Sequence, residues 1–336
     1  MTRIAINGLG RIGRAALKII IDTPGLELVA VNDIVPIENI VYLLKYDTVY
    51  GRYDKTVEGD GENLIIGEKT IRYSSEKDPA NLPWSSLAVD VLLECTGVFT
   101  KREDLEKHIQ AGAKYVILSA PAKSDDVVAV VHGVNTVDGN THIIACASCT
   151  TNCITPVVEI IGRRIGIKKA IMTTVHAYTA SQAIVDSQSK RFERGRAGAA
   201  NFVPTSTGAA RATAKALPEL DNLFDGIAVR GPVAVGSLAD VVIVAERKTS
   251  VEEINQIFTE EAASERYQDI IGVTDDPIVS SDIIKDPRAS VIDLGMTRVV
   301  DGDLIKILSW YDNEWGFTNQ MVRQAQQLGQ AMEAVS

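Results

Sequence analysis

Three cysteines lie close together near the middle of the 336-residue chain, in the stretch "ACASCTTNCITP". Cys146, Cys149 and Cys153 have the spacing C-x-x-C-x-x-x-C. Such a group could hold a metal ion, form a redox pair or supply one reactive thiolate. A structural zinc site normally has four ligands, often two C-x-x-C pairs, and the sequence contains no second pair. We therefore expect no metal site in this protein.

The residues that follow favour one reactive cysteine among the three. "TNCITPVVEIIGRRIG" has the apolar pattern of an amphipathic helix that stops at Gly166, and a start near Ser148 places Cys149 in the first turn. The positive end of a helix dipole stabilises a thiolate and lowers the pKa of a cysteine there. Cys153 lies deeper in the helix and Cys146 ends an apolar strand, where burial favours the neutral thiol. Cys149 is the predicted nucleophile.

A cysteine nucleophile needs a base, and the chain contains four histidines. His176 ends the apolar run "KKAIMTTVHAY", which begins just after the predicted helix stops. A helix, a turn and a returning strand are the simplest path that brings a distant residue back to the start of that helix. We therefore expect His176 to be the base partner of Cys149.

A glycine-rich turn near the N-terminus indicates a dinucleotide site. "RIAINGLGRIGRAALKIII" predicts a strand, a tight turn and a helix, and the turn reads G-x-G-x-x-G. Glycines at these positions let the backbone approach a pyrophosphate at the start of the helix. The predicted cofactor contacts of this turn are Gly8, Gly10, Arg11, Ile12 and Gly13.

The next strands supply the other predicted cofactor contacts. "LELVAVND" is a strand ending at Asn32 and Asp33, and Asp33 follows the last glycine by 20 residues. A carboxylate there binds the adenosine ribose 2′-hydroxyl and repels a 2′-phosphate, which favours NAD over NADP. "AVDVLLECTG" and "AKYVILSAP" read as buried parallel strands. Because ligands bind at the carboxyl ends of such strands, we expect contacts from Thr96, Gly97 and Ser119.

Composition and charge exclude several other classes of protein. The chain is 46% hydrophobic and 23% charged, and its length suits two domains. No apolar run approaches the ~18–20 residues that span a bilayer. A net charge of −10 argues against a nucleic-acid or anionic-membrane partner. No secretory signal is visible, and four cysteines make no disulfide framework. We expect a cytoplasmic protein.

Further segments identify a family. "INGLGRIGR", "ASCTTNC", "TTVHAYTASQ", "PTSTGAA" and "SWYDNEWGF" resemble glyceraldehyde-3-phosphate dehydrogenases, in order along essentially the whole chain. The resemblance implies an α/β fold with a Rossmann-type NAD-binding domain over residues 1–148, completed by a C-terminal helix over 313–336. It implies an α+β catalytic domain with a mixed or antiparallel sheet over residues 149–312. Members of this family are homotetramers and act in glycolysis, so the same is expected here.

The resemblance also implies a reaction. Glyceraldehyde 3-phosphate is oxidised reversibly to 1,3-bisphosphoglycerate with NAD, and inorganic phosphate is the second substrate. Cys149 attacks the aldehyde to form a thiohemiacetal, and His176 takes the hydroxyl proton as hydride leaves. Phosphate then attacks the resulting thioester. Backbone N–H of Cys149 and the imidazolium of His176 are the expected oxyanion donors.

Such a substrate needs two anion pockets and a contact for the nicotinamide. The family pattern places Thr179, Ser181 and Arg230 at the pocket for the substrate phosphate. It places Ser148, Thr150, Arg196, Thr207 and Gly208 at the pocket for the attacking phosphate. Hydroxyls, backbone N–H groups and guanidinium groups are good phosphate ligands. Asn313 matches the residue that binds the carboxamide, and Phe317 replaces a common tyrosine near the nicotinamide.

Departures from the family pattern leave alternatives open. "GPVAVGS" from Gly231 is atypical and loosens the wall beside Arg230, which leaves the natural substrate and the interface geometry open. Ser187 and Gln188 resemble members that also accept NADP, so NADP use is possible beside the preferred NAD. One alternative is an erythrose-4-phosphate dehydrogenase, in which water takes the acyl group. Another is a non-catalytic regulator that senses NAD or a sugar phosphate. Physiological direction and pathway, including arsenate handling, stay open.

Overall fold

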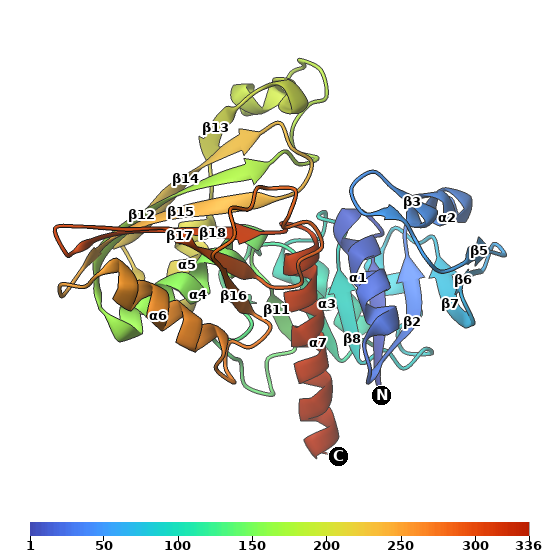
Figure 1. The fold of residues 1–336 in the computed structure, drawn as a ribbon. Coiled ribbons are helices and arrows are strands. Elements are labelled where there is room, and N and C mark those ends of the chain that lie inside the picture. Colours follow the sequence, from blue (N-terminus) through green and yellow to red (C-terminus); the bar gives the residue numbers. More distant parts are fainter. Residues whose placement is uncertain (336) are drawn as a thin grey trace. The chain divides into compact units, whose positions relative to one another are not determined.

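The computed structural model describes the backbone of residues 1–335 and the side chains of residues 1–332. The chain divides into two compact units, each built on its own sheet (Figure 1). The first unit comprises Met1–His132, Thr136–Ala147 and the chain from Thr318 onward. The second comprises Gly133–Asn135 and Ser148–Phe317.

A nine-stranded sheet forms the first unit, in the order β10-β11-β9-β8-β1-β2-β7-β6-β5. The strands from β10 to β7 run parallel, while β5 and β6 add an antiparallel edge. Their bounds are β1 (Thr2–Asn7), β2 (Leu26–Asn32), β5 (Val57–Gly59), β6 (Asn63–Ile66), β7 (Lys69–Ser74), β8 (Val91–Glu94), β9 (Tyr115–Leu118), β10 (Val128–Ala129) and β11 (Ile143–Ala145). The predicted Rossmann-type fold is confirmed.

Helices connect these strands as expected for a doubly wound sheet. They are α1 (Arg11–Asp22), α2 (Ile37–Lys45), α3 (Arg102–Gln110) and the short η1 (Pro79–Asn81), with a small hairpin of β3 (Tyr46–Asp47) and β4 (Gly51–Arg52). Every residue of β8 is buried, and so are five of the six residues of β1. Strands covered on both faces have continuous apolar runs of this kind, because neither face meets water.

The second unit contains a seven-stranded mixed sheet in the order β13-β14-β12-β15-β18-β17-β16. β12 runs parallel to β14 and antiparallel to β15. The strands are β12 (Ile167–Ala177), β13 (Val203–Ser206), β14 (Phe224–Gly231), β15 (Ser237–Ala245), β16 (Ile271–Thr274), β17 (Ser290–Val300) and β18 (Leu304–Tyr311). Buried residues alternate along β15, which shows that one face of the sheet carries the core. The predicted mixed sheet is confirmed.

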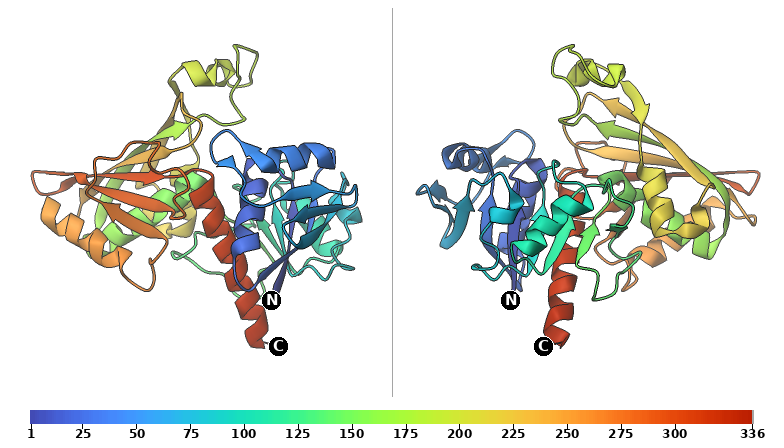
Figure 2. Two further views of the ribbon diagram at one scale, coloured as in Figure 1. Left: turned by 45° about the vertical axis from the view of Figure 1, so that its right-hand side comes forward. Right: turned by 180° about the vertical axis from the view of Figure 1, so that it is seen from behind.

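The helices of the second unit pack on that buried face (Figure 2). They are α4 (Cys149–Arg164), α5 (Ala209–Ala216) and α6 (Val251–Ala262). The unit also contains the short turns η2 (Phe192–Gly195) and η3 (Gly198–Ala200), which contact β13 and β14, and η4 (Pro218–Leu220), which follows α5. Ser250 caps α6 by accepting from the Glu253 N–H at 3.2 Å. The reciprocal half of the capping box is absent, because the Glu253 carboxylate binds Arg247 and Thr249 instead.

The last helix, α7, spans Trp315–Val335. The predicted segment began two residues earlier, at Asn313, and its final residue, Ser336, lies outside the described part of the chain. Over residues 1–335, no helix has the length and apolar character needed to cross a membrane.

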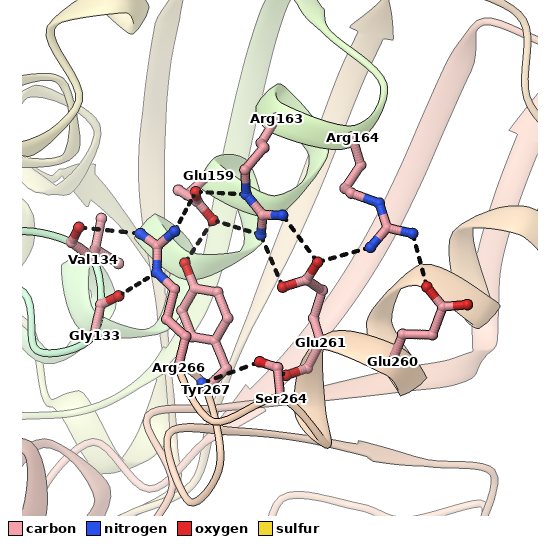
Figure 3. Close-up of polar contacts among 10 residues, drawn as sticks. All are labelled: Gly133, Val134, Glu159, Arg163, Arg164, Glu260, Glu261, Ser264, Arg266 and Tyr267. Carbon is pink, nitrogen blue, oxygen red and sulfur yellow. Dashed lines mark hydrogen bonds and ion pairs between the residues drawn. The ribbon is translucent and has the colours of Figure 1, made fainter.

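An ion-pair network joins α4 to α6 and to the loop that follows it (Figure 3). The Glu159 carboxylate accepts from Arg163 at 3.0 Å, from Arg266 at 2.9 Å and from the Tyr267 hydroxyl at 2.6 Å. Glu261 binds Arg163 at 2.8 Å. Both carboxylate side chains are about nine-tenths buried, so solvent screens these pairs less than surface pairs.

Two backbone carbonyl groups of the inserted segment Gly133–Asn135 belong to the same network. The Arg266 guanidinium donates to the carbonyl oxygens of Gly133 at 2.8 Å and Val134 at 3.2 Å. Glu159 orients this guanidinium, so one carboxylate positions α4, Tyr267 and the segment Gly133–Asn135 together.

Replacing Glu159 should therefore destabilise the second unit measurably. Glu159→Gln removes the charge and one acceptor from a buried side chain that binds two partly exposed arginines, and we expect unfolding to be easier by about 1–3 kcal/mol. Glu260→Gln is the control, because exposed Glu260 pairs with Arg164 alone among the arginines and its loss should cost less than about 1 kcal/mol. Denaturant titration of both variants measures the difference, and equal costs would contradict the central role of Glu159.

Candidate active site

A cavity of about 450 Å³ lies at the carboxyl ends of β1, β2 and β8 in the first unit. Five of the predicted cofactor residues line it: Gly8, Gly10, Asn32, Asp33 and Thr96. Parallel strands of one sheet end at the same edge, so residues far apart in the chain meet there. The position agrees with the rule that ligands of such sheets bind beyond the strand ends.

Each glycine of the turn has a separate steric reason. Gly8 has a φ of +92°, and a Cβ there would come within 2.7 Å of the Thr96 backbone nitrogen. A Cβ on Gly13 would collide with the carbonyl oxygen of Gly8. Gly10 is different, since a Cβ there would meet no atom within 4 Å. Gly10 precedes α1 and offers no side chain to cap it, so the helix start is open to an anion such as a pyrophosphate.

The Asp33 carboxylate is held at this cavity by backbone groups. One oxygen accepts from the Leu9 N–H at 2.6 Å and the other from the Val35 N–H at 3.0 Å. The carboxylate therefore has a defined place beside the glycine turn. A ribose 2′-hydroxyl fits such an acceptor, whereas a 2′-phosphate would meet like charge.

Other predicted contacts lie around the cavity without lining it. Arg11 and Ile12 are the first residues of α1, and the Arg11 guanidinium pairs with Asp47 at 2.5 Å. Gly97 lies in the turn after β8 with a φ of +71°. Ser119 directly follows β9 and donates its N–H to the Glu94 carbonyl at 3.0 Å.

Seven residues of the cavity wall were not predicted from the sequence, and Glu76 and Lys77 are the two charged ones among them. They follow β7, which pairs in parallel with β2. The apolar alternation of "KTIRYS" was the signal for this strand, and the same rule about strand ends would then have indicated them.

In the second unit, the start of α4 places Cys149 opposite His176. The helix begins at Cys149, and the Ser148 hydroxyl caps it by accepting from the Thr151 N–H at 3.1 Å. Gly166, with a φ of +88°, ends the helix and turns the chain into β12. β12 then carries His176 back until its Nε2 lies 3.3 Å from the Cys149 Sγ. The predicted helix start and returning strand are confirmed.

Burial keeps the thiols of the other three cysteines protonated. Cys153 is fully buried and lies 3.5 Å from the Ser309 hydroxyl, and burial raises the pKa of Cys153 to about 12. Burial also raises the pKa of Cys146 to about 12 and raises that of Cys95 further. The described residues contain no disulfide and no group of His, Cys, Asp or Glu side chains that could hold a metal ion.

Burial acts on both members of the Cys149–His176 pair. Burial raises the pKa of the Cys149 thiol, against the lowering effects of Arg230 and the Thr150 hydroxyl and backbone, so the lowered pKa predicted from the helix dipole alone is wrong. Burial first, and then Arg230, lowers the pKa of His176 to about 3. Each group alone is therefore neutral near pH 7. Proton transfer from Sγ to Nε2 leaves the pair without net charge, so the thiolate forms most easily within the pair.

The partners of the other ring nitrogen, Nδ1, determine which tautomer the His176 imidazole adopts. His176 Nδ1 lies 2.7 Å from the Ala177 carbonyl oxygen and 2.5 Å from an Arg230 nitrogen. The guanidinium is only a donor, so it binds Nδ1 when that nitrogen carries no proton. In the alternative tautomer Nδ1–H donates to the Ala177 carbonyl, and Nε2 accepts the thiol proton. The second tautomer is the one that a base requires.

Tyr311 packs behind the pair, and sequence reasoning did not select it. Its ring meets the His176 ring edge-on, with centroids 5.9 Å apart. Its buried hydroxyl contacts the Thr150 hydroxyl at 2.9 Å and the Thr174 hydroxyl at 2.8 Å. Tyr311 thereby joins the first turn of α4 to β12, which are the two elements that carry Cys149 and His176.

The residues predicted for the substrate phosphate lie near the end of β12. The Thr179 and Ser181 hydroxyls are 2.9 Å apart, and Arg230, at the matching end of β14, also reaches the Ala177 carbonyl at 3.2 Å. Burial, the largest cause, lowers the pKa of Arg230, while the Cys149 thiolate would raise it. A cation here with few fixed acceptors suits an incoming phosphate.

The residues predicted for the attacking phosphate fall into two groups. Ser148 and Thr150 belong to the start of α4, while the Thr207 hydroxyl accepts from the Ala209 N–H and Gly208 precedes α5. Arg196 behaves differently, because it is largely exposed and pairs with Asp186 at 2.8 Å.

Arg194, which the sequence analysis did not select, has the better contacts. Its Nε donates to the Thr205 hydroxyl at 3.1 Å and another nitrogen donates to the Ser206 carbonyl. Burial first, then the charges of Arg191 and Arg230, lower the pKa of Arg194, which indicates that Arg230 is near. The basic run "KRFERGR" contains three arginines, and spacing alone could not choose among them.

The atypical segment after Arg230 orients Asn313. The Asn313 Oδ1 accepts from the Gly236 N–H at 3.1 Å and from the Ser237 hydroxyl at 3.0 Å, so its amide NH₂ is directed elsewhere as a donor. Ser237 also accepts from the Ala177 N–H at 3.1 Å. Phe317 is buried in the first turn of α7.

Replacement of His176, the predicted base, should slow the reaction of the thiol itself. His176→Asn removes the acceptor for the Cys149 proton while keeping a polar side chain, and we expect alkylation of Cys149 by iodoacetamide at pH 7 to slow by about 100-fold. Ser181→Ala, which leaves the Sγ–Nε2 contact intact, is the control. Equal alkylation rates for wild type and His176→Asn would show that the imidazole does not activate the thiol.

Comparison with known proteins agrees with this arrangement. The family model described as "Glyceraldehyde 3-phosphate dehydrogenase, NAD binding domain" matches residues 2–102, and the one described as "Glyceraldehyde 3-phosphate dehydrogenase, C-terminal domain" matches residues 148–313. Together they cover both the glycine turn and the Cys149–His176 pair.

Similar whole proteins carry the same name. A glyceraldehyde-3-phosphate dehydrogenase of Zymomonas mobilis subsp. mobilis is 44% identical over 334 residues, which is 98% of this chain and 99% of its own. One of Streptomyces coelicolor is 45% identical over 324 residues, or 95% and 96% of the two chains. One of Clostridium pasteurianum is 44% identical over 330 residues, or 96% and 97%. The chain belongs to the glyceraldehyde-3-phosphate dehydrogenase family.

Proposed function

We propose that this protein catalyses the reversible, phosphorylating oxidation of glyceraldehyde 3-phosphate to 1,3-bisphosphoglycerate with NAD. The observation that carries the proposal is the 3.3 Å contact between Cys149 Sγ and His176 Nε2 at the start of α4, in a chain of this family. A regulator that only sensed the cofactor would have no need of a nucleophile beside a base.

The first half of the proposed reaction takes place on Cys149. The thiolate adds to the aldehyde carbon, and the new alkoxide is stabilised by the Cys149 N–H and by the protonated imidazole. The protonated imidazole gives its Nε2 proton to the alkoxide, and the neutral ring then takes the hydroxyl proton back at Nε2 as the hydride leaves and the carbonyl of the thioester forms. The glycine turn and Asp33 of the first unit would hold NAD, which would supply the acceptor for the hydride.

The second half transfers the acyl group from sulfur to phosphate. Thr179, Ser181 and Arg230 are proposed to hold the phosphate of the substrate. Inorganic phosphate attacks the thioester carbon, the C–S bond breaks, and the Cys149 thiolate is regenerated. A thioester conserves the free energy of oxidation for this step, provided that water does not reach it first.

We assign the guanidinium of the second phosphate pocket to Arg194 in place of Arg196. Arg194 contacts Thr205 and Ser206 of β13, which lead directly to Thr207 and Gly208. Arg196 is turned to Asp186. The other predicted residues, Ser148, Thr150, Thr207 and Gly208, keep their proposed places, with the Thr150 hydroxyl shared with Tyr311.

Each unit is proposed to have one task. We propose that the first unit, predicted as residues 1–148 with the segment 313–336, binds NAD and that the second unit, predicted as residues 149–312, carries out the catalysis. The units themselves divide at Ala147/Ser148 and Phe317/Thr318, and Gly133–Asn135 belongs to the second unit. We propose that both work in the cytoplasm, where the soluble substrates of this reaction are found. Fractionation of intact cells would test the location, and recovery of the protein in another compartment would contradict it.

A homotetramer is the proposed assembly. Ile171 and Val175 of β12 and Ile227 of β14 are exposed on the face of the mixed sheet that α4, α5 and α6 do not cover. Phe192 and Phe202 are still more exposed, at 89% and 72%. Apolar side chains grouped in this way mark a protein interface, and a second copy of this chain is the proposed partner. Light scattering should give about four times the chain mass.

The decisive experiment follows cofactor reduction with glyceraldehyde 3-phosphate and NAD, with and without inorganic phosphate. We expect sustained turnover only with phosphate or arsenate, because acyl transfer regenerates the thiolate. Cys149→Ser should abolish it. A single burst that phosphate does not prolong would point to another acyl acceptor, such as water in an erythrose-4-phosphate dehydrogenase. No burst in a protein that binds NAD would favour the regulator.

A titration with inorganic phosphate distinguishes the roles of Arg194 and Arg196. Arg194→Ala removes a charge-assisted contact to the attacking phosphate, so we expect the KM for phosphate to rise about tenfold or more. Arg196→Ala removes only an exposed pair with Asp186 and should change that KM by less than about threefold. The reverse order would return the assignment to Arg196.

A further inference from the structure

A fully buried carboxylate lies beneath the cofactor cavity of the first unit. Glu94, the last residue of β8, and His108 on α3 both have no exposed surface. Neither residue lines the cavity, and neither has a place in the reaction proposed above. Burial of a charge is costly unless polar groups surround it, so hydrogen-bond donors must stabilise the Glu94 carboxylate.

Four hydrogen bonds meet the Glu94 carboxylate. One oxygen accepts from the Thr96 N–H at 2.8 Å and from the Thr96 hydroxyl at 2.5 Å. The other accepts from the Asn7 amide at 2.6 Å and contacts His108 Nε2 at 3.0 Å. Two carboxylate oxygens have about four lone-pair positions, so this carboxylate is saturated.

Trp84 decides the protonation of His108. The indole nitrogen can only donate, and it lies 3.0 Å from His108 Nδ1, so Nδ1 must be the acceptor. The ring proton is then on Nε2, where it is donated to Glu94. His108 is therefore a neutral imidazole, and hydrogen bonds rather than a cation balance the carboxylate. Trp84 is itself fully buried, which holds this orientation.

The saturated carboxylate orders the turn after β8. Because the Thr96 hydroxyl gives its proton to Glu94, its oxygen is left to accept from the Val98 N–H at 3.1 Å. Thr96 and Val98 both line the cofactor cavity. The position of Thr96 also explains why residue 8 is a glycine, because a Cβ there would collide with the Thr96 backbone.

Asn7 carries the same order to the neighbouring strands. Its amide NH₂ is bound to Glu94, and its Oδ1 accepts from the Asn32 amide at 2.7 Å. The Asn32 Oδ1 in turn accepts from the Glu76 N–H at 2.9 Å. Asn7, Asn32 and Glu76 all line the cavity. The chain of hydrogen bonds that begins at the Glu94 carboxylate thus connects the ends of β8, β1 and β2 with the turn after β7.

We propose that Glu94 and His108 are positioning residues for the cofactor. The chain of hydrogen bonds Trp84–His108–Glu94 holds Asn7 and Thr96 in the arrangement that NAD binding needs. The inference deepens the proposed function, because it rests on NAD as the ligand of this cavity. It does not depend on the reaction at Cys149.

Two substitutions at one position separate hydrogen bonding from mere packing. In His108→Gln the side-chain oxygen can accept from Trp84 and the NH₂ group can donate to Glu94, so both links are kept without an imidazole. His108→Leu fills similar volume but leaves the Trp84 donor without a partner and one Glu94 oxygen with Asn7 as its remaining donor. Leu105→Ala, at another fully buried position of α3, is the control for loss of packing alone.

The measurement is the Kd for NAD of the full-length protein, by calorimetry or quenching of tryptophan fluorescence. We expect the Kd to rise about tenfold or more in His108→Leu and by less than about threefold in His108→Gln. Leu105→Ala should lower the melting temperature but leave the Kd within about twofold. The kcat of His108→Leu at saturating NAD should stay near the wild-type value, because the reacting groups are untouched.

Several results would overturn the inference. They are an unchanged Kd in His108→Leu, a loss in His108→Gln as large as in His108→Leu, or an equal loss in Leu105→Ala. If His108→Leu does not fold, Trp84→Phe is the second variant. It removes the indole donor together with part of the buried ring and should raise the Kd beyond the change in Leu105→Ala, and an unchanged value would overturn the inference too. Direct binding also separates the two proposals: a protein that binds NAD as described yet oxidises no substrate would refute only the proposed reaction.

Discussion

The contact between Cys149 and His176 is the interaction on which the catalytic unit is organised. Ser148 fixes where α4 begins, Gly166 fixes where it ends, and β12 returns His176 to the first turn. Tyr311 then joins the helix start to the strand through two threonine hydroxyls. A shift of one residue in either α4 or β12 would separate Sγ from Nε2. The mixed sheet and its helices therefore serve largely to keep the first turn of α4 aligned with the end of β12.

Burial gives this contact its chemistry. Each group alone is kept neutral, because the interior penalises an isolated charge, but transfer of the proton within the pair creates no net charge. The first unit treats its buried charge differently. There Glu94 is surrounded by donors and has no cationic partner, so the carboxylate becomes a fixed point that orders the strand ends around the cofactor cavity.

Much of this could be read from the sequence, because the signals are local. The glycine turn with Asp33 at its set distance, the helix start at Ser148, and the strand that ends in His176 each depend on a few neighbouring residues. The choice among the three arginines of "KRFERGR" could not be read in this way. Arg194 and Arg196 differ in the side chains that they meet, Thr205 and Asp186, and those contacts depend on how the loop folds back.

The fold class, the family and the cofactor were accessible from the sequence, and Cys149 and His176 were predicted from it as nucleophile and base. These follow from residue type and spacing, which the backbone converts directly into turns, helix ends and strand ends. Tertiary structure alone decided the raised pKa of the Cys149 thiol, the place of Arg194, the orientation of Asn313 and the Glu94 network. The physical reason is that burial and hydrogen-bond partners come from residues far apart in the chain, and no local pattern records them.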